Sequence, residues 1–236
     1  MTDPPATPKG NGLLAALPAT VYRRLLRDLE PTTLQVGDTL FRPTGQLQYA
    51  HFPISSIVTS SYPIGKDGIM AEAWPVGNEG MVGISLFLGG RRRDNRADVQ
   101  IGGTAFRLPA SVLIAEFGRA DAFQHLLLRY VFALVTQASQ LGMCNSHHSV
   151  EQRLCRFLSR VFDRVAGREV TLTQERIAAL LDVRRVSITN AAVQLHAAGI
   201  IEYRRGRVRL LSRERLDERT CPCAGIIRRA FEAVSE

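Results

Sequence analysis

Residues 174–191 carry the apolar spacing of two short helices that cross each other. Counted from Gln174, apolar residues fall at positions 4, 8, 10, 15 and 18, namely Ile177, Leu181, Val183, Ile188 and Ala191. This spacing is typical of a helix-turn-helix, in which a small residue at position 5, here Ala178, lets the second helix cross the first closely. Thr173 is placed to cap the first helix, and Asp182 takes the turn position that requires a positive φ. We expect the second helix to end at Gly199.

The second of these helices turns polar side chains outward near its start, and a basic hairpin follows it. The segment IIEYRRGRVRLL predicts two short strands around a turn at Arg205–Gly206. Side chains of both segments can hydrogen-bond phosphates or base edges, so we predict a winged helix-turn-helix that binds double-stranded DNA. The alternative is a helix pair that only packs within a helical domain. The predicted DNA-binding residues are Thr173, Gln174, Arg184, Arg185, Ser187, Thr189, Asn190, Arg204, Arg205 and Arg207.

The distribution of charge favours a polyanionic partner for the C-terminal half. The formal net charge is +8, and arginine carries almost all of it because only Lys9 and Lys66 are lysines. Residues 149–236 hold 17 arginines against 11 acidic residues, whereas residues 1–148 hold 13 basic against 11 acidic residues. Arginine suits bidentate contacts with phosphates and guanine edges. A basic surface that is merely solvated is the alternative.

The N-terminal half has the pattern of a β-domain behind a short helical segment. Residues 1–12 are rich in Pro and Gly and predict a flexible tail, and residues 13–31 show helical spacing that breaks at Pro18. From residue 33 to residue 108, short runs rich in Val, Ile, Thr, Phe and Tyr alternate with turns such as VGD, GKDG and GNEG. Several short strands at this spacing indicate an antiparallel roll or barrel.

A long helix is predicted after the roll. Its apolar residues recur at intervals of 4, 3, 4 and 3, which is the spacing of a coiled-coil seam. We expect this helix to join two domains and to form a dimer interface, and the alternative is a core helix that lies on the β-domain. A second amphipathic helix over 149–165, capped by Ser149 and ended by Gly167, follows the hinge GMCNSHHS. The predicted dimer interface consists of Leu127, Val131, Leu134, Ala138 and Leu141.

Cysteines and histidines near the C-terminal half suggest soft-ligand chemistry, but their spacing does not define a site. They stand in separate segments and lack the spacing of a zinc finger. Structural roles are favoured, with a metal site or a thiol switch as alternatives, so we assign no metal and no cofactor. An N-terminal cysteine cluster that would hold an iron–sulfur centre is missing. The residues concerned are Cys144, His147, His148, Cys155, Cys221 and Cys223.

Other function classes are disfavoured by what the sequence lacks. No nucleophile–base pair, phosphate-binding loop or pair of carboxylates stands at a usable spacing, so we do not expect an enzyme. No run approaches the roughly 18 apolar residues of a membrane span. The opening residues MTDPPATPKGNG have no apolar core like that of a signal peptide. We therefore expect a cytoplasmic protein with reduced thiols and no membrane partner.

The order of β-roll, long helix and winged helix-turn-helix, with the segment LTQERIAALLDVRRVSITNAAVQLHAAGIIEYRRGRVRLL, resembles regulators of the CRP/FNR (cyclic-AMP receptor protein/fumarate-nitrate regulator) superfamily. The segments VGNEGMVGISLFLGG, LLLRY, CNSHHS and CPC are similar to a branch whose signal is unassigned. The resemblance implies an α+β fold and a homodimer that binds a palindromic operator and contacts RNA polymerase. The implied domains are a flexible tail (1–12), a cyclic-nucleotide-binding-like β-roll (13–119), a dimerisation helix (120–145) and a winged helix-turn-helix domain (146–236).

The ligand pocket implied by this resemblance departs from the cyclic-AMP-binding pattern. Members that bind cyclic AMP hold the ribose with a glutamate, where this chain has Gly83, while Glu79 stands one turn too early. The matching phosphate ligand is Arg93, but Asp94 follows it, and a carboxylate there repels a phosphate. The surrounding run GRRR at 90–93 is typical of a solvated hairpin tip. We expect no control by cyclic AMP through the standard pocket.

The recognition helix also departs from that of the cyclic-AMP receptor. Arg185 keeps the place of the family's first arginine, Val186 replaces a glutamate, and Asn190 replaces a later arginine. The sequence thus predicts a DNA-binding transcription regulator with an operator of its own. Two alternatives stay open, namely a ligand-binding or protein-interaction module without DNA binding, and a redox- or metal-responsive sensor. The sensor would use Cys144, His147, His148, Cys221 and Cys223.

Overall fold

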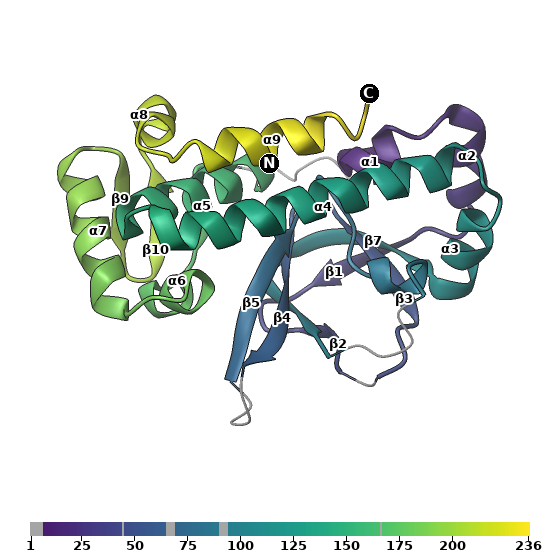
Figure 1. The fold of residues 1–236 in the computed structure, drawn as a ribbon, viewed down its shortest axis with the longest axis horizontal. Coiled ribbons are helices and arrows are strands. Elements are labelled where there is room, and N and C mark those ends of the chain that lie inside the picture. Colours follow the sequence, from purple (N-terminus) through teal and green to yellow (C-terminus); the bar gives the residue numbers. More distant parts are fainter. Residues whose placement is uncertain (1–6, 44, 65–68, 90–93, 166) are drawn as a thin grey trace.

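The computed structural model describes residues 7–43, 45–64, 69–89, 94–165 and 167–236. A β-roll lies beneath one long helix, and a smaller C-terminal domain lies beyond the end of the roll (Figure 1). The last helix of the chain returns along the long helix toward the N-terminal elements. The predicted α+β fold, with a roll, a long helix and a C-terminal winged helix-turn-helix, is confirmed.

Two antiparallel sheets make up the roll, with the strand orders β1-β7-β3 and β2-β6-β4-β5. Val58 and Val99 pair across β4 and β6, and both are buried with Leu34 between the sheets. The turn GKDG lies outside the described residues. The strands are β1 (Glu30–Leu34), β2 (Thr39–Phe41), β3 (Tyr49–Pro53), β4 (Ile57–Ile64), β5 (Ile69–Val76), β6 (Arg96–Ile101) and β7 (Gly103–Pro109), with the short helix η2 (Ile84–Leu86) before β6.

Helices α1 (Gly12–Ala15) and α2 (Ala19–Leu25) cover one end of the roll, and the chain breaks between them at Pro18, as predicted. A third helix, α3 (Ala110–Phe117), follows the last roll strand. Leu14 and Leu25 have 0 % of their surface exposed, so these short helices belong to the main core and are held by packing.

The flexible tail predicted for residues 1–12 is wrong for its last residues. A short helix, η1 (Pro8–Gly10), precedes Asn11, whose side chain is completely buried. Asn11 Nδ2 donates to the carbonyl oxygens of Pro53 at 3.0 Å and Gly80 at 2.8 Å, and its Oδ1 caps α1. A buried amide with all these partners fixes the segment to the roll. Residues 1–6 lie outside the described part.

The long helix α4 (Ala122–His147) is anchored on the roll by a tyrosine. The hydroxyl of Tyr130 donates to the Met81 carbonyl at 2.9 Å and accepts from the Met81 N–H at 3.0 Å. A Cβ at Gly80 would collide with this hydroxyl, which explains the second glycine of GNEG. Neither α4 nor any other described helix has the length and apolar character to cross a membrane.

The predicted dimer seam on α4 is wrong for two residues. Leu127 and Leu134 are 0 % and 5 % exposed, and both lie in the core that α4 shares with the roll and the N-terminal helices. Three exposed apolar side chains of α4 lie one position further along, at Leu128, Phe132 and Val135. A shift of one residue turns the stripe by about 100° around the helix. The remaining predicted seam residues are half-buried: Val131, Ala138 and Leu141.

The C-terminal domain packs its helices on a three-stranded sheet of order β8-β10-β9. Ser149 forms a capping box with Gln152 at the start of the first helix, and Gly167 and Gly199 have positive φ after helix ends, as predicted. Ile188, Leu195 and Val208 are completely buried in its core. The elements are α5 (Val150–Arg164), β8 (Glu169–Thr171), α6 (Gln174–Leu181), α7 (Arg185–Ala197), β9 (Ile201–Arg204), β10 (Arg207–Leu210) and α8 (Arg213–Glu218).

The final helix α9 (Cys223–Glu232) packs antiparallel to α4 (Figure 1). The rings of Phe231 and Tyr130 lie 6.1 Å apart between their centroids, and Val234 enters the main core. The chain therefore leaves the C-terminal domain and ends against the helix by which it entered that domain.

Buried arginines of α5 hold this domain on the roll. Arg164 contacts Glu79, and Arg160 Nη2 lies 3.8 Å from the same Glu79 Oε1. Arg160 also donates to Gln137 Oε1 on α4 at 2.5 Å. Burial, followed by the charge of Arg164, lowers the pKa of Arg160. Glu79 is thus a partner of α5 in the joint between the domains.

Candidate nucleic-acid interface

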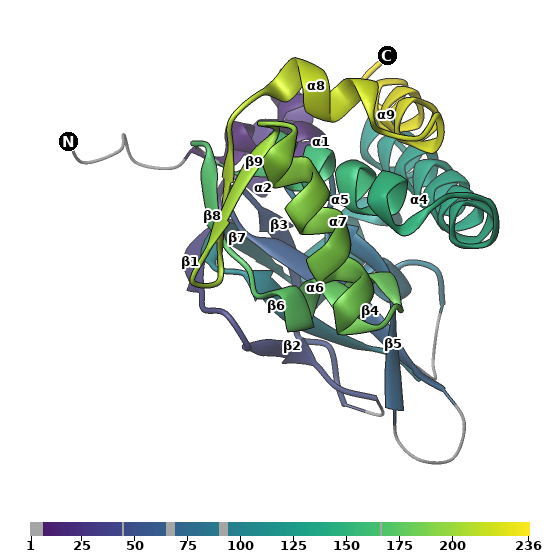
Figure 2. The same ribbon diagram turned by 90° about the vertical axis from the view of Figure 1, so that its left-hand side faces the viewer.

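Helix α7 lies at the outer end of the C-terminal domain, where one of its sides is uncovered (Figure 2). Val186, Asn190 and Val193 share this side because they stand four and three residues apart. Val186 is 59 % exposed and Val193 is 62 % exposed. The opposite side of the helix packs on the core through Ile188, Ala191, Ala192 and Leu195.

Two exposed arginines begin this helix. Arg184 takes the N-cap position but makes no side-chain hydrogen bond to the first turn. Within the described residues neither Arg184 nor Arg185 forms an ion pair. The helix N-terminus adds a partial positive charge and free N–H groups. An anion or a base acceptor can therefore bind here with little competition from the protein.

The turn between α6 and α7 has the predicted conformation. Asp182 lies in the left-handed region, with φ of 49° and ψ of 58°, and Thr173 Oγ1 accepts from the N–H of Arg176 at 3.2 Å. The hydroxyl of Thr189 donates to Gln174 Oε1 at 2.7 Å. Gln174 and Thr189, both predicted to contact DNA, thus also bind each other and fix the crossing of the two helices.

The wing is formed by β9 and β10, which pair antiparallel around Arg205 and Gly206. Both turn residues have positive φ, 49° and 76°, as a tight two-residue hairpin turn requires. The hydroxyl of Tyr203 donates to the carbonyl of Leu172 and ties the wing to the segment before α6. Burial raises the pKa of Tyr203 to about 12. The side chain of Arg207 faces solvent, and its Nη1 lies 3.2 Å from Glu169 Oε1.

A groove of about 410 Å³ separates the wing from the two helices. Arg185 reaches it from α7 and Arg205 from the wing, so the structure brings these two predicted residues to one surface. Arg204 and Arg207 line a neighbouring hollow on the wing, Ser187 is half-buried, and Asn190 stands on the open side of α7. The groove is lined by Thr173, Gln174, Glu175, Arg185, Tyr203, Arg205 and Gly206.

Residues 152–219 match the family model of the Crp-like helix-turn-helix domain. The match runs from α5 through α6, α7 and the wing to α8. This part of the chain is a Crp-like helix-turn-helix domain. A comparison with curated proteins gave no match.

Solved structures share the fold of the chain, including the roll and α4. FixK2 from Bradyrhizobium japonicum is 17% identical with a TM-score of 0.68, and 82% of this chain and 98% of FixK2 are covered. A transcriptional regulator of the CRP family from Thermus thermophilus is 18% identical with a TM-score of 0.64, covering 80% and 95%. The c-di-GMP responsive global regulator CLP of Xanthomonas campestris is 17% identical with a TM-score of 0.58, covering 83% and 100%. The chain thus shares the fold of these solved structures, and its match to a family model covers residues 152–219.

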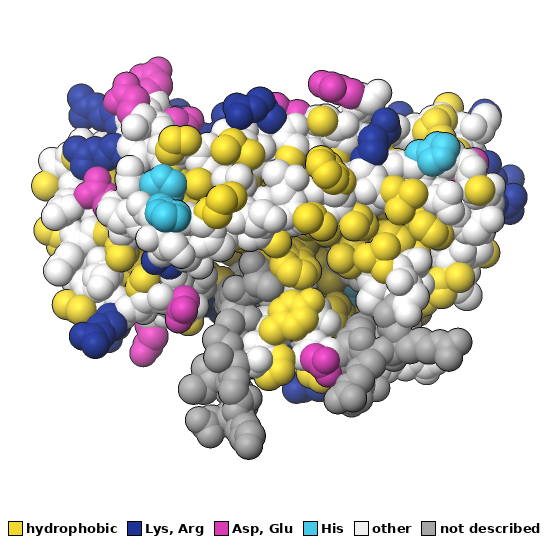
Figure 3. Space-filling model, in the orientation of Figure 1, with side chains coloured by type: hydrophobic (Ala, Val, Ile, Leu, Met, Phe, Trp, Pro, Cys, Tyr) yellow, Lys and Arg dark blue, Asp and Glu magenta, His cyan; other side chains and the backbone are white. Residues whose placement is uncertain are grey.

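A cavity of about 360 Å³ opens into the roll beside α4, and hydrophobic side chains surround the hollow below this helix (Figure 3). Gly83 and Asp94 line the cavity together with apolar groups such as Met81 and Trp74. Glu79 does not line it, because Arg160 and Arg164 hold its carboxylate at the domain joint. Arg91, Arg92 and Arg93 lie outside the described residues.

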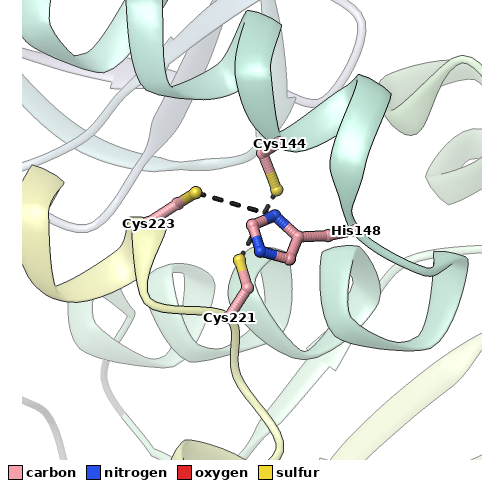
Figure 4. Close-up of side chains that lie close together, drawn as sticks. All are labelled: Cys144, His148, Cys221 and Cys223. Atoms are coloured by element: carbon pink, nitrogen blue, oxygen red, sulfur yellow. Dashed lines mark hydrogen bonds between the residues drawn. The ribbon is translucent and has the colours of Figure 1, made fainter.

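The structure brings four of the six cysteines and histidines together. Cys144 Sγ lies 3.5 Å from Cys221 Sγ, and Cys223 Sγ lies 3.7 Å from Nδ1 of His148 (Figure 4). Burial raises the pKa of the Cys144 and Cys223 thiols. Cys155 belongs to the core of the Crp-like domain, and His147 is exposed. Sequence spacing missed this cluster because its pairs lie more than 70 residues apart.

Proposed function

We propose that this protein is a transcription regulator that binds double-stranded DNA with α7 and the wing. The observation that carries the proposal is the pair of exposed arginines at the start of α7, which make no ion pair within the described residues. A helix of this kind fits the major groove, where arginine binds guanine O6 and N7. The match to the Crp-like helix-turn-helix domain supports the same assignment.

In this proposal different parts of the surface contact bases, thymine methyl groups and phosphates. Arg185 and Asn190 make base contacts, while the methyl groups of Val186 and Val193 pack against thymine methyl groups. Arg204, Arg205 and Arg207 of the wing bind phosphates beside the groove, together with Arg184 and Ser187. Helix α6 lies across the DNA backbone and is held there by Thr173, Gln174 and Thr189. Sequence reasoning did not assign a role to the two valines, although their spacing at i and i+7 was a usable signal.

We propose that the protein acts as a homodimer through the exposed stripe of α4. Leu128, Phe132 and Val135 are 46 %, 72 % and 57 % exposed and follow the heptad spacing of a coiled coil. Ser139 and Gly142 continue the stripe with small residues, which permit close approach of a second helix. Dimerisation would place two recognition helices on half-sites about 34–36 Å apart, so the operator is palindromic.

Replacing Phe132 with Glu tests this interface. The account expects a monomer in sedimentation and a loss of operator binding of at least about tenfold, since both half-sites must be occupied. Ile114→Glu is the matched control, because Ile114 is also an exposed apolar helix residue, 49 % exposed, but lies on α3. A dimer that persists in F132E would place the interface elsewhere.

We further propose that cyclic AMP does not control the protein through the roll cavity. Gly83 supplies no carboxylate for a ribose, and the carboxylate of Asp94 disfavours a phosphate in the same cavity. Because a ligand shifts a conformational equilibrium only through differential affinity, a cavity that does not bind cannot switch the dimer. Calorimetry with cyclic AMP and cyclic GMP should give no heat of binding at micromolar ligand. Micromolar binding with tighter operator binding would contradict this part.

The DNA-binding proposal is tested by selecting duplexes from a random pool and measuring their affinity for the full chain. The expected product is an inverted repeat bound at least about a thousandfold more tightly than random duplex. Equal affinity for all duplexes would favour a module that packs its helix-turn-helix without reading DNA. The same proposal includes contact with RNA polymerase, a cytoplasmic location and the lack of enzymatic activity. It also keeps the domain bounds 13–119, 120–145 and 146–236.

A further inference from the structure

The buried cluster of Cys144, His148, Cys221 and Cys223 has the composition of a tetrahedral metal site. Its four ligand atoms all lie within 4.8 Å of one another, and the three cysteines have 0 %, 2 % and 5 % of their surface exposed. Cys144 lies in the last turn of α4, and His148 is the C-cap residue, whose backbone N–H donates to the Cys144 carbonyl at 3.1 Å and keeps the two residues close together. Cys221 approaches from the segment before α9, and Cys223 is the first residue of that helix (Figure 4).

The distances in the cluster fit zinc. Zn²⁺ bonds thiolate sulfur at about 2.3 Å and imidazole nitrogen at about 2.0 Å in structural sites of the Cys₃His type. A tetrahedron with those bonds holds two sulfurs about 3.8 Å apart and a sulfur and a nitrogen about 3.5 Å apart. In the structure the Sγ atoms of Cys144 and Cys221 lie 3.5 Å apart, and Cys223 Sγ lies 3.7 Å from His148 Nδ1. An ion at the centre requires these two edges to change by about 0.3 Å or less, and the remaining edges, none longer than 4.8 Å, to contract by about 1.3 Å at most.

A buried arginine complements the charge that such a site would carry. Three thiolates and a neutral imidazole leave a zinc site with one net negative charge. Arg156 is only 3 % exposed, and within the described residues it makes no hydrogen bond or ion pair, while its Nε is wholly buried. Its charge acts on both Cys144 and Cys223. A buried cation without an acidic partner is costly, and an anionic metal centre nearby would offset that cost.

We propose that Cys144, His148, Cys221 and Cys223 bind one zinc ion that ties the Crp-like domain to α4. Two of the ligands stand just before this domain and two just after it, so the ion joins the points at which the chain enters and leaves it. Closing a loop of this length removes conformational freedom from the unfolded chain. The zinc site thereby fixes the orientation of α7 relative to the helix proposed to form the dimer.

Metal analysis of the full chain, purified under reducing conditions and supplied with zinc, tests the site. Wild-type protein should carry about one zinc ion per chain, and cobalt in its place should give the absorption of a tetrahedral thiolate complex. Cys221→Ser combined with Cys223→Ser should carry none. Wild-type protein that binds no zinc, or a double variant that keeps it, would overturn the proposal, and so would a Cys144–Cys221 disulfide in the reduced preparation.

The two adjacent histidines provide a matched pair that does not depend on the folding of cysteine variants. His148→Ala removes a proposed ligand, whereas His147→Ala changes an exposed neighbour outside the cluster. Zinc affinity, measured by competition with a chelator, should fall in H148A by more than the roughly 10–100-fold that loss of an outer partner causes. Zinc should raise the melting temperature of wild type and H147A by the same amount and that of H148A much less. Equal behaviour of the two variants would exclude His148 as a ligand.

Discussion

The arginines of α5 and the arginines of α7 and the wing occupy opposite environments within one basic domain. On α5, Arg164 is buried with Glu79 as its partner, and Arg160 donates to Gln137. At the start of α7, Arg184 and Arg185 are exposed and make no ion pair within the described residues. The first group holds the Crp-like domain on the roll, and the second group faces the solvent from which DNA would approach.

A count of charges does not distinguish buried arginines from exposed ones. Each arginine of either group adds one positive charge to the count for residues 149–236, yet only exposed cations can release counterions from DNA. A buried guanidinium has lost its hydration, so removing its acidic partner or the guanidinium itself leaves a buried group uncompensated. Mutations in the two groups should therefore have different readouts, stability for α5 and DNA affinity for α7 and the wing.

The largest effect is expected from Arg164→Ala. This change leaves Glu79 without its main partner at the domain joint, where the Arg164 side chain is 5 % exposed and that of Glu79 is 20 % exposed. The free energy of unfolding should fall by about 3 kcal/mol, as for other broken buried pairs. Urea denaturation measures it, with Arg168→Ala as the control because Arg168 is exposed a few residues further on. If the two variants are equally stable, the buried arginine of α5 contributes no more to stability than an exposed one does.

A smaller effect, in binding and not in stability, is expected from Arg185→Ala. Loss of one bidentate base contact should weaken binding to the selected duplex by about 1–3 kcal/mol, which is roughly 5- to 150-fold. Fluorescence anisotropy with the selected duplex and a scrambled duplex measures the change, and the melting temperature should stay that of wild type. A loss that is the same on both duplexes would make Arg185 a phosphate contact.

Arg207→Ala should have a still smaller effect that does not depend on the DNA sequence. Arg207 lies on the exposed wing, and its ion pair with Glu169 contributes little because both groups are in water. Binding to the selected and the scrambled duplex should weaken equally, and the slope of log affinity against log salt should decrease by about 1. A sequence-dependent loss, measured in the same titrations, would place the wing in contact with bases.

The smallest change is expected from exchanging arginine for lysine at these positions. Arg207→Lys keeps the charge for a phosphate and should bind almost as wild type does. Arg185→Lys loses the planar fork that pairs with guanine and should keep less discrimination between duplexes. Titrations of both variants against the two duplexes check this difference, and equal discrimination would argue against a bidentate contact at Arg185.

Local features of the fold could be predicted from sequence because neighbouring residues determine them. The positive φ of Asp182, the cap by Thr173 and the hairpin at Arg205–Gly206 depend on a few adjacent residues. The exposed apolar stripe of α4 could not be placed from the sequence, because the run LLL at 126–128 is apolar on two sides of the helix. Only the structure shows which of these sides the roll covers.

Several features that depend on particular long-range contacts escaped prediction. Asn11 reads as part of a polar tail, but its amide is buried against Pro53 and Gly80. Cys144 approaches Cys221 only because α9 returns along α4, and no spacing within the sequence records that return. The buried arginines of α5 stand in a sequence pattern that equally fits a solvated amphipathic helix.

Arginine-selective dicarbonyl labelling followed by mass spectrometry tests the contrast between the two groups most directly. In the free protein the account predicts labelling of Arg184, Arg185, Arg204, Arg205 and Arg207 and little labelling of Arg156 or Arg164. The selected duplex should protect the first group and leave the second unchanged, whereas a scrambled duplex at the same concentration should protect much less. Unprotected arginines on α7 and the wing, or ready labelling of Arg156 and Arg164 in the folded protein, would contradict the account.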